Sequence, residues 1–182
     1  MRISFNHPYI NLTLGSRDKF TGAVTSIPEH KPGFELKADS GVYRYLQATS
    51  ATSEGYGARF IRSGFLTSNF GATPLLTADV TLPVDVGAVV TAGGLAANQW
   101  GWYWLGEGED FLYMASTCQG GMAGGNVGAF TSAGQFFATS TLAQASGKII
   151  ADVMVADSNT SSGLRLCRAS RLMVANFTTN PN

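Results

Sequence analysis

All three tryptophans of the chain lie at alternate positions in one short segment, and this spacing constrains the fold more than any other feature. The segment reads Gln-Trp-Gly-Trp-Tyr-Trp-Leu over residues 99–105 and contains Trp100, Trp102 and Trp104. On a β-strand, side chains two residues apart point to the same face, so the three indoles share one face. Each indole can remove about 200 Å² of surface from water, so this face is expected to be covered. Three things could cover it: the core of the domain itself, another protein chain, or a stack of sugar rings.

After residue 40 the chain alternates between short strand-like segments and glycine-containing turns. Glycine accounts for 22 of the 182 residues and charged residues for only 13%, a composition that favours short strands joined by tight turns. The clearest strand is 42–48, in which Tyr43 and Tyr45 share one face and Val42 and Leu46 the other. Intervals of about ten residues predict an all-β domain that is barrel-like or a sandwich. Further strands are predicted over 57–62, 75–81, 86–91, 99–105, 110–115, 134–139, 148–155 and 164–174, with a loop or bulged strand over 120–128.

Residues 1–40 are predicted to form an extended N-terminal arm that precedes a β domain over residues 41–182. Pro8, Pro28 and Pro32 help to interrupt the hydrophobic periodicity that a helix or strand would need in this segment. Such a segment cannot form a core of its own, so it is either disordered or laid across another surface, and we expect the second. The apolar residues expected to anchor it include Phe5, Tyr9, Leu12 and Phe20.

The histidines and cysteines do not form a recognisable catalytic, metal-binding or cofactor-binding group. His7 and His30 both lie in the predicted arm, where surface or interface positions are expected. Cys118 and Cys167 are not spaced as metal ligands and are interpreted as buried free thiols. We therefore predict no catalytic residues, no metal ligands and no cofactor.

Three neighbouring acids raise the alternative of a glycoside hydrolase. Glu107, Glu109 and Asp110 follow the tryptophan-rich segment, and paired carboxylates can hydrolyse glycosidic bonds. Their spacing is not specific, and a Gly-Glu-Gly-Glu-Asp sequence is typical of a solvated hairpin loop. We therefore predict that the chain is not an enzyme.

The charge and hydropathy of the chain argue against nucleic acid and membrane as partners. Twelve basic and twelve acidic side chains cancel, so no overall positive field would attract nucleic acid. The most apolar stretch, 84–97, is too short to cross a bilayer, and the N-terminus lacks the apolar region of a secretory signal. We predict synthesis in the cytoplasm. The low charge also suits a protein that works as an assembly.

Several segments between residues 38 and 155 follow one another in an order known from a family of small proteins. The order is a tyrosine-bearing strand at 42–48, Glu-Gly-Tyr-Gly-Ala-Arg at 54–59, Leu-Pro-Val-Asp-Val-Gly-Ala-Val at 82–89 and Ala-Ala-Asn-Gln-Trp-Gly-Trp at 96–102. This order resembles that of the capsid decoration, or cement, proteins of tailed phages. The bulky residues at 103–105 depart from the small polar and apolar alternation that usually follows Gly-Trp in the family, and the arm lies outside the resemblance.

The resemblance implies a β-barrel-like subunit bound in many copies to the outside of an icosahedral head, where it stabilises contacts between major capsid protein subunits. It implies the major capsid protein and further copies of this chain, as a trimer or another homo-oligomer, as partners, and the capsid exterior as location. The tryptophan strand leaves a carbohydrate- or receptor-binding β module of a virion appendage as the alternative. The residues predicted to form contact surfaces are Phe5, Tyr9, Leu12, Phe20, Tyr43, Tyr45, Trp100, Trp102 and Trp104.

Overall fold

The described part of the protein consists of strands, turns and connecting segments, without a helix. The computed structural model describes residues 26–60, 71–74, 84–114, 127–130, 134–139, 148–155 and 161–176. The strands are β1 (Glu35–Ala38), β2 (Gly41–Ala48), β3 (Gly57–Phe60), β4 (Gly71–Pro74), β5 (Val84–Val89), β6 (Trp100–Trp104), β7 (Gly106–Met114), β8 (Val127–Phe130), β9 (Phe136–Thr139), β10 (Lys148–Val155), β11 (Gly163–Arg171) and β12 (Met173–Asn176). The predicted all-β class is confirmed for these residues.

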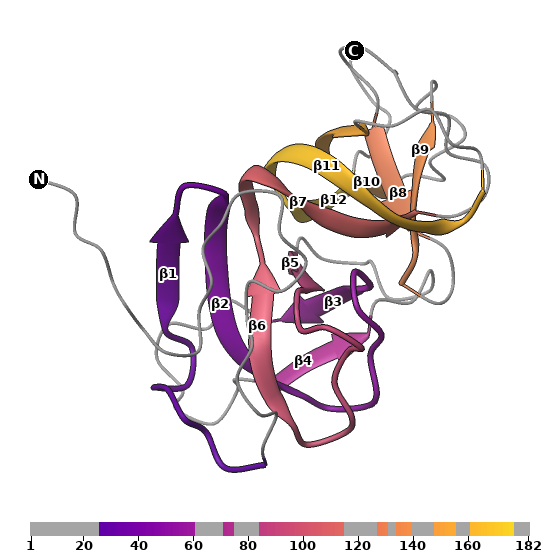
Figure 1. Cartoon of the computed structure of the whole chain (residues 1–182). Helices are drawn as coiled ribbons and strands as arrows, with labels where there is room; N and C mark the ends of the chain where they lie inside the picture. The colour runs from indigo at the N-terminus through magenta and orange to yellow at the C-terminus, as the bar shows by residue number, and fades with distance from the viewer. Residues whose placement is uncertain are drawn as a thin grey trace, which may run out of the picture.

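The strands belong to one continuous sheet that is arranged as two groups, β1 to β6 and β7 to β12 (Figure 1). In the first group, each of β2, β3, β4, β5 and β6 pairs with two others of that set. In the second group, the same is true of β7, β8, β9, β10 and β11. The groups are joined where β5 pairs with β12, at Asp85 opposite Met173. One strand, β5, therefore connects the two halves of the sheet.

Most of the predicted strands are present. The predictions over 42–48, 57–62, 86–91, 99–105, 110–115, 134–139 and 148–155 are confirmed by β2, β3, β5, β6, β7, β9 and β10. The strand predicted over 164–174 is in fact two strands, β11 and β12, interrupted at Leu172. The backbone of Leu172 is hydrogen-bonded to Leu105 and Val86 instead. The strand predicted over 75–81 lies outside the described residues, as does most of 120–128, which ends in β8.

The hairpin loop predicted over residues 106–110 is wrong, because this stretch is the beginning of β7. Residues from Gly106 onward pair with β11, and Asp110 lies opposite Cys167. The chain bends at Gly106 and Glu107, whose φ angles of 97° and 59° lie in the left-handed region. The glycines and acids that suggested a solvated loop are therefore held in the sheet by backbone pairing.

The described part of the predicted arm lies against the sheet, and its last residues are the strand β1. β1 pairs antiparallel with β2, and a tight turn at Asp39 and Ser40 joins them. Leu36 and Ala38 pack against the core. The sheet thus begins within the range predicted for the arm. The arm residues Phe5, Tyr9, Leu12 and Phe20 lie outside the described residues.

Two apolar clusters occupy the two faces of β2 and β6, as the predicted alternation of these strands requires. Tyr43 and Tyr45 belong to the first cluster, and Val42 and Leu46 to the second. The first cluster is completed by residues of β5, β7, β9 and β11, and the second by residues of β3, β4 and β5. Both faces of these two strands are therefore buried over most of their length.

Candidate functional site

The aromatic face shared by β2 and β6 passes from complete burial at one end to partial exposure at the other. The strands pair in a register that places Tyr43 opposite Trp104 and Tyr45 opposite Trp102. Tyr43 and Trp104 are 0% exposed, Tyr45 and Trp102 are 4% and 5% exposed, and Trp100 is half-buried. The domain's own core therefore covers Trp102 and Trp104, and only the Trp100 end of the face remains open.

Two further rings join Trp100 at this open end. The ring of His30 lies 5.0 Å from that of Tyr45 and 5.3 Å from that of Trp102, measured between centroids. Phe34 packs edge-on against Trp102 at 6.1 Å, and Trp100 stacks on Tyr45 at 5.6 Å. We call His30, Phe34 and Trp100 the aromatic rim. It lies on the buried pair Tyr45 and Trp102. Of its three members, only Trp100 belongs to the predicted contact surface.

The segment before β1 is held in place by backbone hydrogen bonds to β2. The Tyr45 backbone receives a hydrogen bond from the Gly33 N–H at 2.8 Å and donates one to the Phe34 carbonyl at 2.9 Å. The Tyr45 hydroxyl also accepts a hydrogen bond from the Glu29 N–H at 3.2 Å. Ile27 at 76% and Phe34 at 46% are the exposed large hydrophobic residues of the described part, and both belong to this segment. Sequence reasoning missed Ile27 and Phe34.

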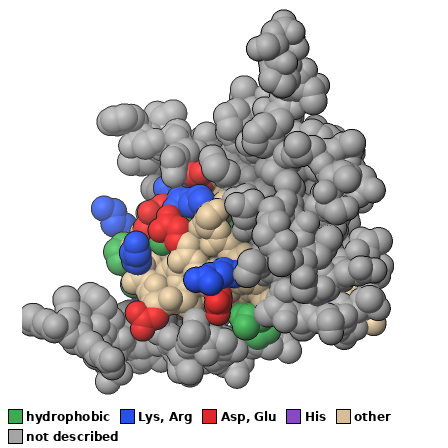
Figure 2. Space-filling model, turned by 90° about the horizontal axis from the view of Figure 1, so that it is seen from above, with side chains coloured by type: hydrophobic (Ala, Val, Ile, Leu, Met, Phe, Trp, Pro, Cys, Tyr) green, Lys and Arg blue, Asp and Glu red, His purple; other side chains and the backbone are tan. Residues whose placement is uncertain are grey.

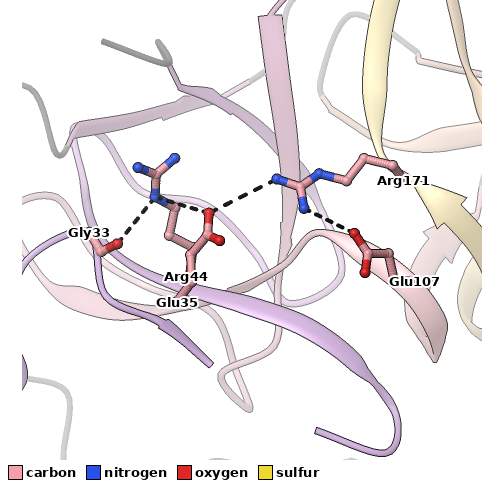
Figure 3. Close-up of polar contacts among 5 residues, drawn as sticks. All are labelled: Gly33, Glu35, Arg44, Glu107 and Arg171. Atoms are coloured by element: carbon pink, nitrogen blue, oxygen red, sulfur yellow. Dashed lines mark hydrogen bonds and ion pairs between the residues drawn. The ribbon is translucent and has the colours of Figure 1, made fainter. Parts of the chain in front are cut away.

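Charged side chains beside β1 form a mixed network instead of a patch of one sign. Glu35 lies 3.9 Å from Arg44 and 4.0 Å from Arg171, and Arg171 lies 3.3 Å from Glu107 (Figure 3). Glu107 also lies 3.7 Å from Lys37. In Figure 2, basic and acidic side chains gather side by side on the described part of the surface. Exposed pairs of this kind contribute about 1 kcal/mol or less each, but together they connect β1 with β2, β7 and β11.

A buried polar cluster connects the turn after β1 with β7. The Tyr43 hydroxyl donates a hydrogen bond to Asp110 Oδ2 at 2.7 Å and lies 2.6 Å from the Ser40 hydroxyl. Asp110 Oδ1 accepts a hydrogen bond from the N–H of Phe111 at 2.7 Å, and Asp110 is 2% exposed. Both carboxylate oxygens of Asp110 thus have donors within the interior, which suits an anchoring role.

The three acids considered for glycoside hydrolysis do not point to a common site. Glu107 and Glu109 are surface side chains, paired with Arg171 at 3.3 Å and with Arg168 at 3.9 Å. Asp110 is buried on the other face of β7, since side chains alternate along a strand. The structure therefore separates Asp110 from the other two.

Stability is expected to fall at alkaline pH because two buried tyrosines resist ionisation. Burial raises the pKa of the Tyr43 and Tyr103 hydroxyls above the usual 10.0, and the charge of Asp110 raises that of Tyr43 further. The unfolded chain releases these protons near pH 10 while the folded chain retains them. The stability is therefore present below about pH 10 and is lost above it, by about 1.4 kcal/mol per pH unit for each group.

Urea unfolding between about pH 9 and pH 11 measures this fall. Tyr103→Phe is the informative variant, because the Tyr103 hydroxyl is buried without a hydrogen-bond partner among the described residues. The variant should match or exceed the wild type in stability at pH 7 and lose less stability above pH 10. If Tyr103→Phe loses as much unfolding free energy per pH unit above pH 10 as the wild type, Tyr103 is not a source of the alkaline loss of stability.

No protein-family model matches this chain, and no curated protein matches it. Within the described ranges, no group of three or more His, Cys, Asp or Glu side chains could hold a metal ion. Cys167 is buried and donates a hydrogen bond from Sγ to the Arg165 carbonyl oxygen at 3.4 Å, and Cys118 lies outside the described residues. The same residues contain no helix long and apolar enough to cross a membrane.

Proposed function

We propose that this chain is a capsid decoration protein that binds the outer surface of a tailed-phage head and stabilises contacts between major capsid protein subunits. The observation that carries the proposal is a pair of exposed large apolar side chains: Ile27 and Phe34 lie on a stretch fixed to β2, and Phe34 belongs to the aromatic rim. A protein that binds a shell needs apolar contact area on a rigid support, and many symmetric copies multiply a modest contact. The order of segments that resembles decoration proteins adds to this support.

The same proposal includes a structural role without catalysis and a location on the capsid exterior. Glu35, next to the rim residue Phe34, is paired with Arg44, and the exposed Glu29 and Lys31 on either side of His30 carry opposite charges. The surface offered to a partner therefore has no strong net charge. We also propose a barrel-like arrangement for β2 to β6, since each of these strands has two neighbours within the set. A closed set of strands would give the rim a rigid base.

Ile27→Ser is expected to weaken binding to phage heads at least tenfold while leaving the fold intact. Ile27 is 76% exposed, so its replacement removes little packing within the domain, whereas burial against a shell would be worth about 1.5 to 3 kcal/mol. Binding is measured by co-sedimentation with heads of the encoding phage prepared without this protein. Lys31→Ser, at an exposed position of the same segment, is the control and should bind like the wild type. Wild-type protein that stays in the supernatant would refute the proposal, as would a source genome without head genes.

A carbohydrate-binding module is the second candidate, and one observation favours it. Trp100 is half-buried, stacks on Tyr45 with an interplanar angle of 23°, and lies opposite Gln47 in the strand register. The side-chain amide of Gln47 donates a hydrogen bond to the Asn98 carbonyl oxygen at 3.1 Å, and its own carbonyl oxygen can still accept one. A stacked indole beside an amide is suited to a neutral sugar ring. Trp100→Ala should then abolish binding of cellohexaose, chitohexaose or maltohexaose in tryptophan-fluorescence titrations, while Phe34→Ala retains it. Absence of binding to all three by the wild type would remove this candidate.

A further inference from the structure

β1 lies at the end of the sheet, and its outer edge offers backbone groups to a partner strand. Among the described strands, β1 pairs only with β2. The Tyr45 N–H donates to the Phe34 carbonyl, and hydrogen-bonded pairs recur at every second residue of an antiparallel ladder. Leu36 and Ala38 therefore direct their backbone groups to β2. Those of Glu35 and Lys37 point outward.

We propose that this edge binds β1 of a second copy of the chain, antiparallel and about a twofold axis at Leu36. In this register Glu35 lies opposite Lys37 of the second copy, and Lys37 lies opposite the second copy's Glu35. Each of these pairs exchanges two backbone hydrogen bonds, because these are the residues whose N–H and C=O groups face outward. Opposite charges directly across the strands stabilise the same pairs.

The charges of β1 select this register over its neighbours. A twofold axis at Glu35 would place two glutamates opposite each other, and an axis at Lys37 would place two lysines opposite each other. A twofold axis between two residues would place a residue whose backbone groups point outward opposite one whose groups point toward β2. Such a pair cannot exchange hydrogen bonds, because the direction of the backbone groups alternates from residue to residue. A lysine on an edge strand usually discourages pairing, but here the facing residue is a glutamate. This self-complementarity identifies a second copy as the partner.

The proposed pairing also covers an exposed aromatic side chain. Phe34, Leu36 and Ala38 share the face of β1 that lies toward the core. Across the twofold axis, Phe34 would lie opposite Ala38 of the second copy, and the two copies of Leu36 would face each other. Phe34 is 46% exposed in the single chain, so this contact removes apolar surface from water.

The ion pairs of Glu35 and Lys37 within the chain do not prevent this arrangement. Glu35 lies 3.9 Å from Arg44 and 4.0 Å from Arg171, and Lys37 lies 3.7 Å from Glu107. The Lys37 side chain is 80% exposed and that of Glu35 is 48% exposed, so both can accept a second partner at little cost. The inference goes beyond binding to a phage head, and it is tested on the isolated protein. Its failure would leave head binding unaffected.

Sedimentation equilibrium of charge variants tests the pairing. The wild type should form a dimer. Glu35→Lys should shift it to monomer by at least tenfold in the dissociation constant, because the introduced lysine faces Lys37 of the second copy. Adding Lys37→Glu should restore the dimer, although the double variant worsens the charges facing Arg44 and Glu107 within each chain. Lys31→Glu, a change of charge of equal size and opposite sign outside β1, should leave the dimer unchanged. A monomeric or trimeric wild type, or a double variant without rescue, would overturn the proposal.

Cysteine cross-linking gives an independent measurement. Two copies of Leu36 at the axis form a non-hydrogen-bonded pair with Cα atoms about 4.5 Å apart, within the reach of a disulfide. Leu36→Cys should therefore yield a covalent dimer on mild oxidation. Ala38→Cys is the matched control, because the two copies of this position would be about 14 Å apart. Equal cross-linking of both variants, or none in Leu36→Cys, would overturn the register.

Discussion

Replacing Gly108 with alanine is expected to lower the free energy of unfolding by about 3 kcal/mol, whereas the same replacement at Gly163 leaves it unchanged or raises it slightly. A Cβ atom at Gly108 would lie 2.4 Å from the carbonyl oxygen of Ser40 and 2.5 Å from its carbonyl carbon. The same oxygen accepts a hydrogen bond from the Glu109 N–H at 3.0 Å. β7 would therefore have to move away from the turn after β1, with loss of this contact.

Gly163 is the matched control, because it lies in β11 and pairs with Met114 at the other end of β7. An added Cβ at Gly163 has no atom within 4 Å, and alanine loses less backbone entropy than glycine in a strand. Urea unfolding followed by tryptophan fluorescence measures both variants. Equal stabilities would show that the close approach of β7 to Ser40 is not required by the fold.

Trp104→Ala is expected to destabilise the domain by about 3 to 5 kcal/mol, and Trp100→Ala by only about 1 kcal/mol. The two residues have the same side chain, strand and face, and differ in burial: Trp104 is 0% exposed and Trp100 is half-buried. Packing around Trp104 is tight, since a Cβ at Gly41 would lie 2.4 Å from its Nε1 atom. A cavity at this position has little room to collapse.

Denaturant unfolding of the two variants measures the difference directly. Trp102→Ala should fall nearer to Trp104→Ala, since Trp102 is 5% exposed. Trp104→Phe separates volume from chemistry, because it retains much of the ring and removes an indole N–H that is buried without a partner among the described residues. It should be more stable than Trp104→Ala. If Trp100→Ala is as damaging as Trp104→Ala, the buried-to-exposed order of this face is incorrect.

Local patterns predicted the strands well, because side-chain alternation is a property of a few neighbouring residues. The shared face of Trp100, Trp102 and Trp104 followed from their spacing alone. Their cover did not, because it comes from distant segments such as β7, β9 and β11. The sequence therefore did not decide whether the core, another protein or a sugar covers this face. In the structure, the core of the domain buries the two inner tryptophans.

The two errors, the loop predicted over 106–110 and the missed Phe34, both result from contacts with residues distant in sequence. The acids after Trp104 were expected in a loop because glycine and charge dominate the local composition. Pairing with β11 and the hydrogen bond from Tyr43 to Asp110, 67 residues apart, place them in a strand instead. Phe34 was missed because nothing in its neighbourhood shows that β1 will extend the sheet and bring it to Trp102.

The role of β5 in joining the two groups has a consequence for how the protein folds. β5 pairs with β3 and β6, which are close in sequence, and with β12, which lies near the other end of the chain. During synthesis, the interval between Asp85 and its partner Met173 takes on the order of 10 s. Strands β2 to β6 are synthesised well before β12 leaves the ribosome. Until then, the end of β5 that pairs with β12 has no partner strand there. Slow folding with a transient open edge is therefore expected, and a chaperone that protects this edge would raise the yield of native protein.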